Sequence, residues 1–337
     1  MRFLNIFKHY TGKSAGERFI LLPFQVFIVA NLVGFYWKDT NERRFTQSYL
    51  QMARKQGKSF FAGALCMYYL VADGEASAEV LLLANSRQQA KDIDFAVVAA
   101  LSKQLDAKQK TLKQFRDYLT IPSTQSRLKV LAAEAKTGDG YNCSFGLIDE
   151  YHESPDSKMK DLVVSSQGMR QSPHCCIVTT AGFDRSKPCY IFRCYCAEVL
   201  HGTKEDDSLF AAIYELDESD DWTDKTNWIK SNPCLGQTVT EKYISEQVTK
   251  AKNNPSDEVG VKTKTLNVWC SASSVWIPEH YILKNTKSIS IKDFSGESCY
   301  IGVDLAAVSD LTAVSFMIPK EGILYYFTKY YLPASAL

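Results

Sequence analysis

The six residues Arg54-Lys55-Gln56-Gly57-Lys58-Ser59 decide how this chain folds. They follow an apolar run at positions 49–52 and precede the almost wholly apolar stretch Phe60–Leu70, so they predict a loop between a buried strand and a buried helix. In such a loop the backbone N–H groups, the helix N-terminus and the Lys58 ammonium all face one polyphosphate. The stretch therefore predicts a phosphate-binding loop.

This loop departs from the usual pattern G-x-x-x-x-G-K-[ST] because Met52 stands where the first glycine is expected. Taken alone, the stretch is also compatible with a basic turn before a core helix. A second triplet, Gly12-Lys13-Ser14, has neither a strand pattern before it nor an apolar helix pattern after it. The sequence context therefore favours residues 54–59 as the phosphate loop.

A second stretch, Phe145–Glu150, reads as a buried strand that ends in two carboxylates. Asp149 suits a ligand of Mg²⁺, and Glu150 suits a residue that activates the water attacking a γ-phosphate. Together with the phosphate loop, this stretch predicts a hydrolase of nucleoside triphosphates.

The composition indicates a globular chain of about two domains. Its 337 residues are 45% hydrophobic, which is enough for a large core. A formal net charge of +1 predicts no overall basic field, so contacts with nucleic acid would depend on local patches. The ten cysteines lack the spacing of a zinc site or a small disulfide scaffold, and predict unpaired thiols in a reducing cytoplasm.

The longest apolar stretch, Phe19–Trp37, has the length of a membrane span but is interrupted by Pro23, Gln25 and Asn31. We expect a core helix there rather than a membrane helix or a signal peptide. The Gln25 amide could contact an adenine edge, or it could simply be a polar residue at a helix N-terminus.

Strand and helix patterns alternate through the first 216 residues, which predicts an α/β fold with a mainly parallel sheet and helices on both faces. The predicted strands are 79–84, 127–132, 145–149, 175–180 and 209–216, and the predicted helices are 86–104, 158–169 and 188–200. Thr179 and Thr180 end a strand at the edge where such sheets bind ligands, so they could sense the γ-phosphate. An ordinary strand-to-loop turn is the alternative.

The sequence after residue 216 no longer alternates between strand and helix patterns. An acidic run at 217–224 and the polar stretch 222–276 predict a solvated connector rather than a core. Strands at 299–304, 311–318 and 322–330 then predict an antiparallel meander. Asp304 ends the first of these strands, where it could bind one metal of a two-metal nuclease, with Asp310 as a further candidate. Such a site needs at least two further acidic ligands, and after Asp310 only Glu321 is available.

With these residues assembled, the chain resembles the large terminase subunit of tailed bacteriophages, the motor that packages DNA into empty capsids. The motifs that carry the resemblance are, in order, Pro23-Phe24-Gln25, Arg43-Arg44-Phe45, residues 53–59, Ser86-Arg87-Gln88-Gln89-Ala90, Leu147-Ile148-Asp149-Glu150, Thr179-Thr180-Ala181-Gly182, and Gly302-Val303-Asp304 with Asp310-Leu311-Thr312-Ala313. Each motif is weak alone, but their order and spacing are specific.

The resemblance implies a P-loop ATPase domain of the RecA-like (ASCE) type at 1–220, a connector at 221–295 and an incomplete RNase H-like nuclease domain at 296–337. It implies that Gln25 contacts adenine and that Thr179 and Thr180 couple hydrolysis to motion. It implies that the loop binds the β- and γ-phosphates through Lys58. It also implies that Arg54 stabilises the charge that develops in the transition state. The residues implied to bind nucleotide or metal in the ATPase are Gln25, Arg54, Lys55, Gln56, Gly57, Lys58, Ser59, Asp149, Thr179 and Thr180, with Glu150 acting on the attacking water.

The resemblance further implies ATP and Mg²⁺ as cofactors, and Mg²⁺ or Mn²⁺ for a completed nuclease site. The implied partners are double-stranded DNA, the small terminase subunit and the phage portal, on which several copies could form a ring in the cytoplasm of the bacterial host. In such motors an arginine of the neighbouring subunit commonly completes the ATPase site. In this sequence only Lys136 is a candidate to replace that arginine. Family members extend beyond position 337, so we expect a competent ATPase and an incomplete nuclease.

Two other interpretations stay open. A helicase would share the roles of Lys58, Asp149 and Glu150, but it needs a second strand–helix series that does not follow residue 220. A non-catalytic prophage remnant that only binds terminase or portal partners would explain Met52, whereas the intact Lys58, Ser59, Asp149 and Glu150 argue against it.

Overall fold

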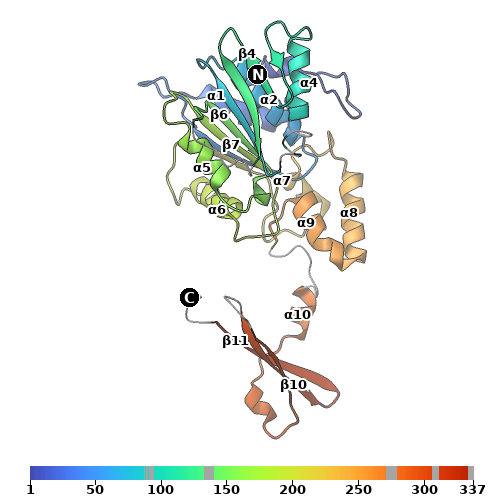
Figure 1. Cartoon of the computed structure of the whole chain (residues 1–337). Helices are drawn as coiled ribbons and strands as arrows, with labels where there is room; N and C mark the ends of the chain where they lie inside the picture. Colours follow the sequence, from blue (N-terminus) through green and yellow to red (C-terminus); the bar gives the residue numbers. More distant parts are fainter. Residues whose placement is uncertain are drawn as a thin grey trace. The chain divides into compact units, whose positions relative to one another are not determined.

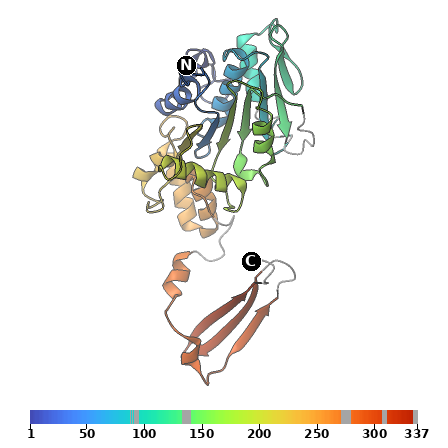
Figure 2. The ribbon, with the colours of Figure 1, turned by 90° about the vertical axis from the view of Figure 1, so that its left-hand side faces the viewer.

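The computed structural model describes residues 1–86, 88, 90, 95–132, 140–270, 279–305 and 311–332. It divides the chain into two compact units, Met1–Trp276 and Ile277–Leu337. The first unit is built on a large sheet and the second on a small antiparallel one (Figures 1 and 2).

The sheet of the first unit has eight strands in the order β3-β4-β5-β2-β6-β7-β1-β8. Their bounds are β1 Gln47–Gln51, β2 Glu79–Ala84, β3 Lys113–Gln114, β4 Tyr118–Ile121, β5 Ser126–Ala132, β6 Phe145–Asp149, β7 His174–Thr179 and β8 Leu209–Ile213. Neighbours from β5 to β8 pair in parallel, and only β3 and β4 add antiparallel pairs. The prediction of a mainly parallel α/β sheet is confirmed.

Helices cover both faces of this sheet, and the central strands are therefore apolar on both sides (Figure 1). The helices α1 (Pro23–Gly34), α2 (Lys58–Val71) and α4 (Ala96–Leu105) share one apolar cluster, and α5 (Lys158–Ser165) and α6 (Pro188–Leu200) share another. In β2, Val80 and Leu82 belong to the first cluster, while Leu81 and Leu83 belong to the second. The uninterrupted apolar runs of the sequence are explained by this burial on both faces.

The predicted elements differ from the observed ones mainly in length. The stretch 19–37 contains the 12-residue helix α1, whose Ile28, Val29 and Leu32 are buried, as expected of a core helix. No helix within the described ranges is long and apolar enough to cross a membrane. The helix predicted at 86–104 is described as α4 only from Ala96, because residues 87, 89 and 91–94 lie outside the described part.

The stretch predicted to be a connector contains a core of its own. Its helices are α7 (Trp228–Ser231), α8 (Glu241–Asn253) and α9 (Glu258–Leu266). They enclose an apolar cluster that includes Trp228, Ile244, Val248 and Leu266, all nearly inaccessible to solvent. The interpretation of this stretch as solvated is therefore wrong, because its few apolar residues lie on one face of each amphipathic helix. The domain boundaries at 220 and 295 stay a prediction.

The second unit holds a short helix, α10 (Glu279–Asn285), and three antiparallel strands in the order β11-β10-β9. The strands are β9 (Tyr300–Asp304), β10 (Thr312–Lys320) and β11 (Ile323–Tyr331). The predicted meander is confirmed. Asp304 is exposed at the end of β9, while Asp310 lies outside the described residues.

Candidate nucleotide-binding and catalytic site

The phosphate loop and the two carboxylates meet at the carboxyl edge of the parallel sheet. Strand β7 lies between β6 and β1, with Asp149 opposite Val178 and Thr179 opposite Gln51. One strand therefore separates the end of β6 from the start of the loop. Ligands of open parallel sheets bind at this edge.

One cavity, about 510 Å³ in volume, collects the predicted residues. Its lining includes Arg54, Lys55, Gly57, Lys58, Ser59, Asp149 and Glu150. An ammonium, a hydroxyl and two carboxylates thus face one space large enough for a polyphosphate.

The loop conformation explains why Met52 is tolerated. Gly57 has a φ of 73° and caps the N-terminus of α2, so this position needs a residue that adopts the left-handed region easily. Lys55 also lies in that region, at a φ of 65°. Met52 does not, and its side chain packs in the core, so glycine is not required there.

Lys58 is buried and bonds to its own loop. Its Nζ donates to the carbonyl oxygens of Met52 at 3.2 Å and Ala53 at 2.9 Å. Burial is the main cause that lowers the pKa of Lys58, and the nearby carboxylates of Glu150 and Asp149 oppose this shift. The ammonium therefore lies beside the two acids, held by acceptors that a phosphate could replace.

Asp149 is buried at the end of β6, and Glu150 follows it with a φ of 51°. This left-handed conformation is uncommon for a residue with a side chain and is a form of strain found at functional positions. The Glu150 backbone N–H lies 2.9 Å from the Val178 oxygen and 3.0 Å from Oδ1 of Asp149. These contacts fix the backbone of Glu150 and the carboxylate of Asp149 beside the cavity.

His152 links Glu150 to the end of β7. Its Nδ1 lies 3.1 Å from Oε2 of Glu150, 3.1 Å from Oγ1 of Thr179 and 3.3 Å from Oγ1 of Thr180. Burial acts to raise the pKa of Glu150, but the contact with His152 and the charge of Lys58 outweigh it and lower that pKa. Sequence reasoning missed His152, although it stands only two residues after Glu150.

The α7–α9 segment holds the front half of the phosphate loop. The backbone N–H groups of Ala53 and Arg54 donate to the carbonyl oxygens of Ser231 and Lys264, at 3.3 and 3.0 Å. Both donors are therefore engaged by protein. The first N–H groups of α2 have no intrahelical acceptor and can bind phosphate.

The buried side chain of Gln56 completes this attachment. Its Nε2 donates to Oδ1 of Asn232 at 2.7 Å, and its Oε1 accepts from the Cys234 backbone at 2.8 Å. Gln56 therefore fixes the loop through its side chain and does not line the nucleotide cavity. Sequence reasoning missed Asn232, because nothing local marks a buried asparagine 176 positions from its partner.

Several predicted site residues lie elsewhere. Gln25 is buried in the first turn of α1, where its Oε1 accepts from the Leu22 backbone at 3.0 Å, which fits the capping alternative. Thr179 and Thr180 contact His152 and do not line the cavity. Lys136, the substitute for a second-subunit arginine, lies outside the described residues.

Seven of the ten cysteines are buried, in agreement with the expected structural thiols. Among the residues that the structure describes, no three His, Cys, Asp or Glu side chains gather closely enough to bind a metal by themselves. A metal at the cavity would therefore need other oxygen ligands beside Asp149, and Ser59 offers one.

The fold and the cavity define a P-loop nucleotide-binding protein of the α/β class. Residues 23–198 match the family described as "Terminase large subunit, ATPase domain", and residues 203–337 match "Terminase large subunit, endonuclease domain". The chain belongs to the terminase large subunit family, which confirms the resemblance seen in its motifs.

Individual relatives agree with this assignment. The chain is similar to the terminase large subunit of Enterobacteria phage HK97, at 25% identity over 90% of this chain and 58% of that protein. Protein YmfN of Escherichia coli K12 is 34% identical over 55% of this chain and 41% of YmfN. The crystal structure of the HK97 large terminase matches with a TM-score of 0.66 at 21% identity, covering all of this chain and 68% of that one. The chain thus spans about half the length of the curated relatives that it matches.

Proposed function

We propose that this chain is the ATP-hydrolysing motor of phage DNA packaging, which moves double-stranded DNA into a procapsid. The observation that carries the proposal is that Lys58, Asp149 and Glu150 line one cavity beside a phosphate loop. Membership of the terminase large subunit family supports DNA as the translocated substrate.

The residues divide the chemistry of ATP hydrolysis between them. Lys58 and the N–H groups at the start of α2 bind the β- and γ-phosphates. Glu150, kept ionised by its lowered pKa, orients the attacking water and accepts its proton. Arg54 lines the same cavity, where a guanidinium can stabilise charge on the transferred phosphoryl group.

The oxygen ligands of the cavity fit Mg²⁺. Asp149 supplies a buried carboxylate and Ser59 a hydroxyl, which are hard donors of the kind that Mg²⁺ prefers alongside substrate phosphates. When bound there, Mg²⁺ neutralises phosphate charge.

We also propose that the motor assembles as in its family, as a ring on the phage portal with the small terminase subunit, in the cytoplasm of the bacterial host. An arginine or lysine from a neighbouring copy would complete the site. Thr179 and Thr180 are proposed to pass the state of the nucleotide to β7, since both contact His152 beside Glu150.

For the second unit we propose an endonuclease metal site for Mg²⁺ or Mn²⁺ in which Asp304 is one metal ligand and Asp310 a further candidate, and which these residues leave incomplete. A plasmid-nicking assay with Mn²⁺ tests this proposal. We expect no cutting above background, and robust nicking that disappears in Asp304→Ala would contradict it.

ATP turnover with and without double-stranded DNA tests the motor function. We expect turnover by the wild-type chain that DNA accelerates, and loss of turnover in Lys58→Ala. Lys13→Ala is the matched control, because it removes the exposed lysine of the other Gly-Lys-Ser triplet. Turnover that is insensitive to Lys58→Ala would favour a remnant that only binds partners.

A further inference from the structure

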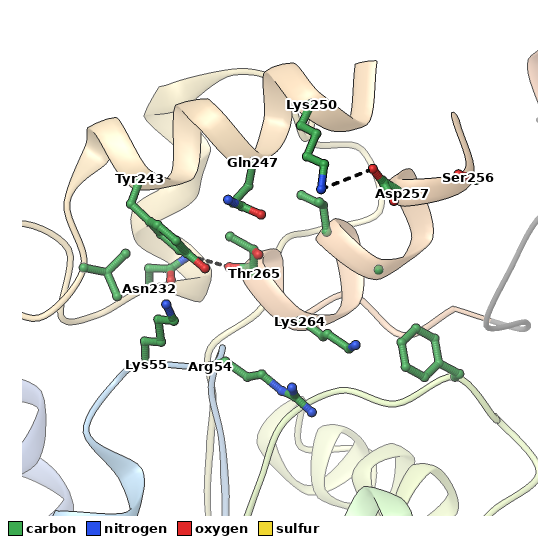
Figure 3. Close-up of a pocket in the computed structure, with 14 residues that line it drawn as sticks. Arg54, Lys55, Asn232, Tyr243, Gln247, Lys250, Ser256, Asp257, Lys264 and Thr265 are labelled. Atoms are coloured by element: carbon green, nitrogen blue, oxygen red, sulfur yellow. Dashed lines mark hydrogen bonds and ion pairs between the residues drawn. The ribbon is translucent and has the colours of Figure 1, made fainter. Parts of the chain in front are cut away.

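A second cavity, about 460 Å³ in volume, borders the phosphate loop on the side of α8 and α9 (Figure 3). Its charged lining residues are Arg54, Lys55, Lys250, Lys264 and Asp257, so four cations face one carboxylate. Arg54 and Lys55 also line the nucleotide cavity. The two cavities therefore share part of the loop.

Three of these cations form no ion pair within the described residues, although the charge of Arg54 contributes to lowering the pKa of Glu150 in the neighbouring cavity. Lys250 lies 3.7 Å from Asp257, whereas Arg54, Lys55 and Lys264 form no ion pair with any carboxylate in the described ranges. Close like charges repel one another unless a counter-charge is present.

Two lysines on these helices outside the cavity are paired with carboxylates. On α9, Lys262 lies 2.6 Å from Glu258, and on α8, Lys242 lies 3.9 Å from Glu246. The helices therefore carry carboxylates that pair with lysines outside the cavity, but none that pairs with Lys264. Lys252 of α8 also forms no ion pair in the described part of the chain, so what sets the cavity apart is that several cations face one space.

Aromatic rings hold two of the cations at its walls. Nζ of Lys55 lies 4.3 Å from the ring centre of Tyr243, and Nζ of Lys264 lies 5.9 Å from that of Phe183. Such contacts favour a cation over the ring face and keep its long side chain from spreading into solvent. Figure 3 shows Arg54 and Lys264 next to each other, from the loop and from the end of α9.

We propose that this cavity binds a phosphate group, separately from the nucleotide cavity. A guanidinium fork and several ammonium groups around one space match the charge and the multiple acceptor oxygens of phosphate. The phosphate has two possible sources, the backbone of DNA or a small free phosphate. The assignment of the phosphate to DNA rests on the proposed motor function, whereas the proposal of a phosphate site does not.

The shared residues give this site a consequence for catalysis. A phosphate in the second cavity attracts Arg54 and Lys55, which also face the nucleotide. Binding at one site then changes the affinity at the other, and the effect is reciprocal. DNA bound there would thus act directly on the loop that holds ATP.

Substitutions that leave the shared loop intact test the site. Lys264→Gln, Lys250→Gln and the double variant remove cations, and Asp257→Asn removes the carboxylate. Lys252→Gln is the matched control, because Lys252 is an exposed lysine of α8 that does not line the cavity. Thermal unfolding of each variant checks that the fold is kept.

Two probes are titrated into each variant with the nucleotide cavity saturated by AMPPNP and Mg²⁺. One is a short fluorescein-labelled DNA duplex, followed by anisotropy at several salt concentrations, and the other is inorganic phosphate, followed by calorimetry. If DNA is the source, each cation removed lowers the slope of log affinity against log salt by about 0.9. Asp257→Asn tightens binding, and Lys252→Gln leaves it as in wild type.

The results of these titrations distinguish DNA phosphate from a small free phosphate. Weaker DNA binding in Lys264→Gln and Lys250→Gln assigns the site to DNA phosphate. Weaker phosphate binding with DNA binding unchanged assigns it to a small phosphate. The proposal is overturned if neither probe responds, or if Lys252→Gln has as large an effect. A failed motor function would show separately, as absent AMPPNP binding, and the phosphate titration would still report on the cavity.

Discussion

His152 is the residue that joins Glu150 to the end of β7. It lies within hydrogen-bonding distance of Glu150, Thr179 and Thr180 at once, and its side chain is almost fully buried. A side chain in this place can fix the Glu150 carboxylate in one position while sensing movement of β7. We regard it as a positioning residue.

Replacing His152 therefore affects the chemical step more than nucleotide binding. In His152→Ala we expect kcat to fall roughly tenfold to hundredfold, because a displaced base loses alignment with the water. KM for ATP should stay close to wild type. His152→Gln keeps an amide donor and should recover part of kcat, as measured by steady-state turnover.

The exposed His201 at the end of α6 provides the control, since His201→Ala should leave both constants unchanged. A parallel rise of KM and loss of thermal stability in His152→Ala, without recovery in His152→Gln, would show that the residue has only a structural role.

The sequence predicts the site residues that belong to recognisable motifs and misses those, such as His152 and Asn232, that no motif marks. Lys58, Asp149 and Glu150 are predicted correctly as neighbours, because strand ends of a parallel sheet meet at one edge. The side-chain partner of Gln56 was not predictable, since Asn232 is far away in sequence. Gln25 could be read two ways: its contact with the Leu22 backbone fits a polar residue at a helix N-terminus, and the adenine contact stays a prediction.

At the scale of elements, strand β6 is held in place by its contact with α5. A Cβ built on Gly146 would lie 2.3 Å from Cγ1 of Val163, closer than real atoms approach. The helix packs directly on the strand backbone, three residues before Asp149. Position 146 therefore needs glycine because of space rather than backbone conformation.

We expect Gly146→Ala to lower the free energy of unfolding by about 1–3 kcal/mol, the usual cost of overpacking a dense core. Gly168→Ala is the matched control, since a Cβ there meets nothing within 4 Å. Urea denaturation of both variants measures the difference. Equal stability of the two variants would mean that α5 moves freely away from β6.

The attachment of the phosphate loop to α7–α9 makes a second prediction at this scale. Asn232 is buried and accepts from Gln56 at 2.7 Å while donating to the Thr265 carbonyl at 3.0 Å. Asn232→Ala leaves buried polar partners unsatisfied, which costs about 1–3 kcal/mol. We expect both a lower unfolding midpoint and weaker binding of a fluorescent ATP analogue.

Gln237→Ala serves for comparison, because Gln237 is exposed in the same segment. If Asn232→Ala lowers stability but binds the nucleotide as wild type does, the segment stabilises the fold without shaping the loop.

The elements themselves were predictable to different degrees. Strands buried on both faces, such as β2 and β7, stand out as apolar runs. The helices α8 and α9 were taken for a connector because their exposed faces are rich in lysine, and only Ile244, Val248 and a few similar residues form the buried face. When the apolar stripe of a helix is narrow, the composition of the segment is mostly polar, and the buried face is easily overlooked in the sequence.

At the scale of the whole molecule, the chain divides into the compact units 1–276 and 277–337, whereas the terminase ATPase family matches residues 23–198 and the endonuclease family matches residues 203–337, beginning inside the first unit. A net charge of +1 hides a strongly uneven distribution, since four cations collect around one cavity next to the phosphate loop. Composition could not reveal this cluster, because Arg54 and Lys264 are far apart in sequence and meet only in the fold.

We expect Lys58 and Glu150 to act on the same triphosphate, Lys58 in binding and Glu150 in catalysis. The most direct test of this expectation measures two quantities, nucleotide affinity and the rate of single-turnover hydrolysis. Both are measured in Lys58→Ala and in Glu150→Gln. We predict that Lys58→Ala loses affinity for ATP, whereas Glu150→Gln binds ATP as wild type does and hydrolyses it on the order of a hundredfold or more slowly. Hydrolysis by Glu150→Gln at the wild-type rate, or undiminished ATP binding by Lys58→Ala, would contradict the account.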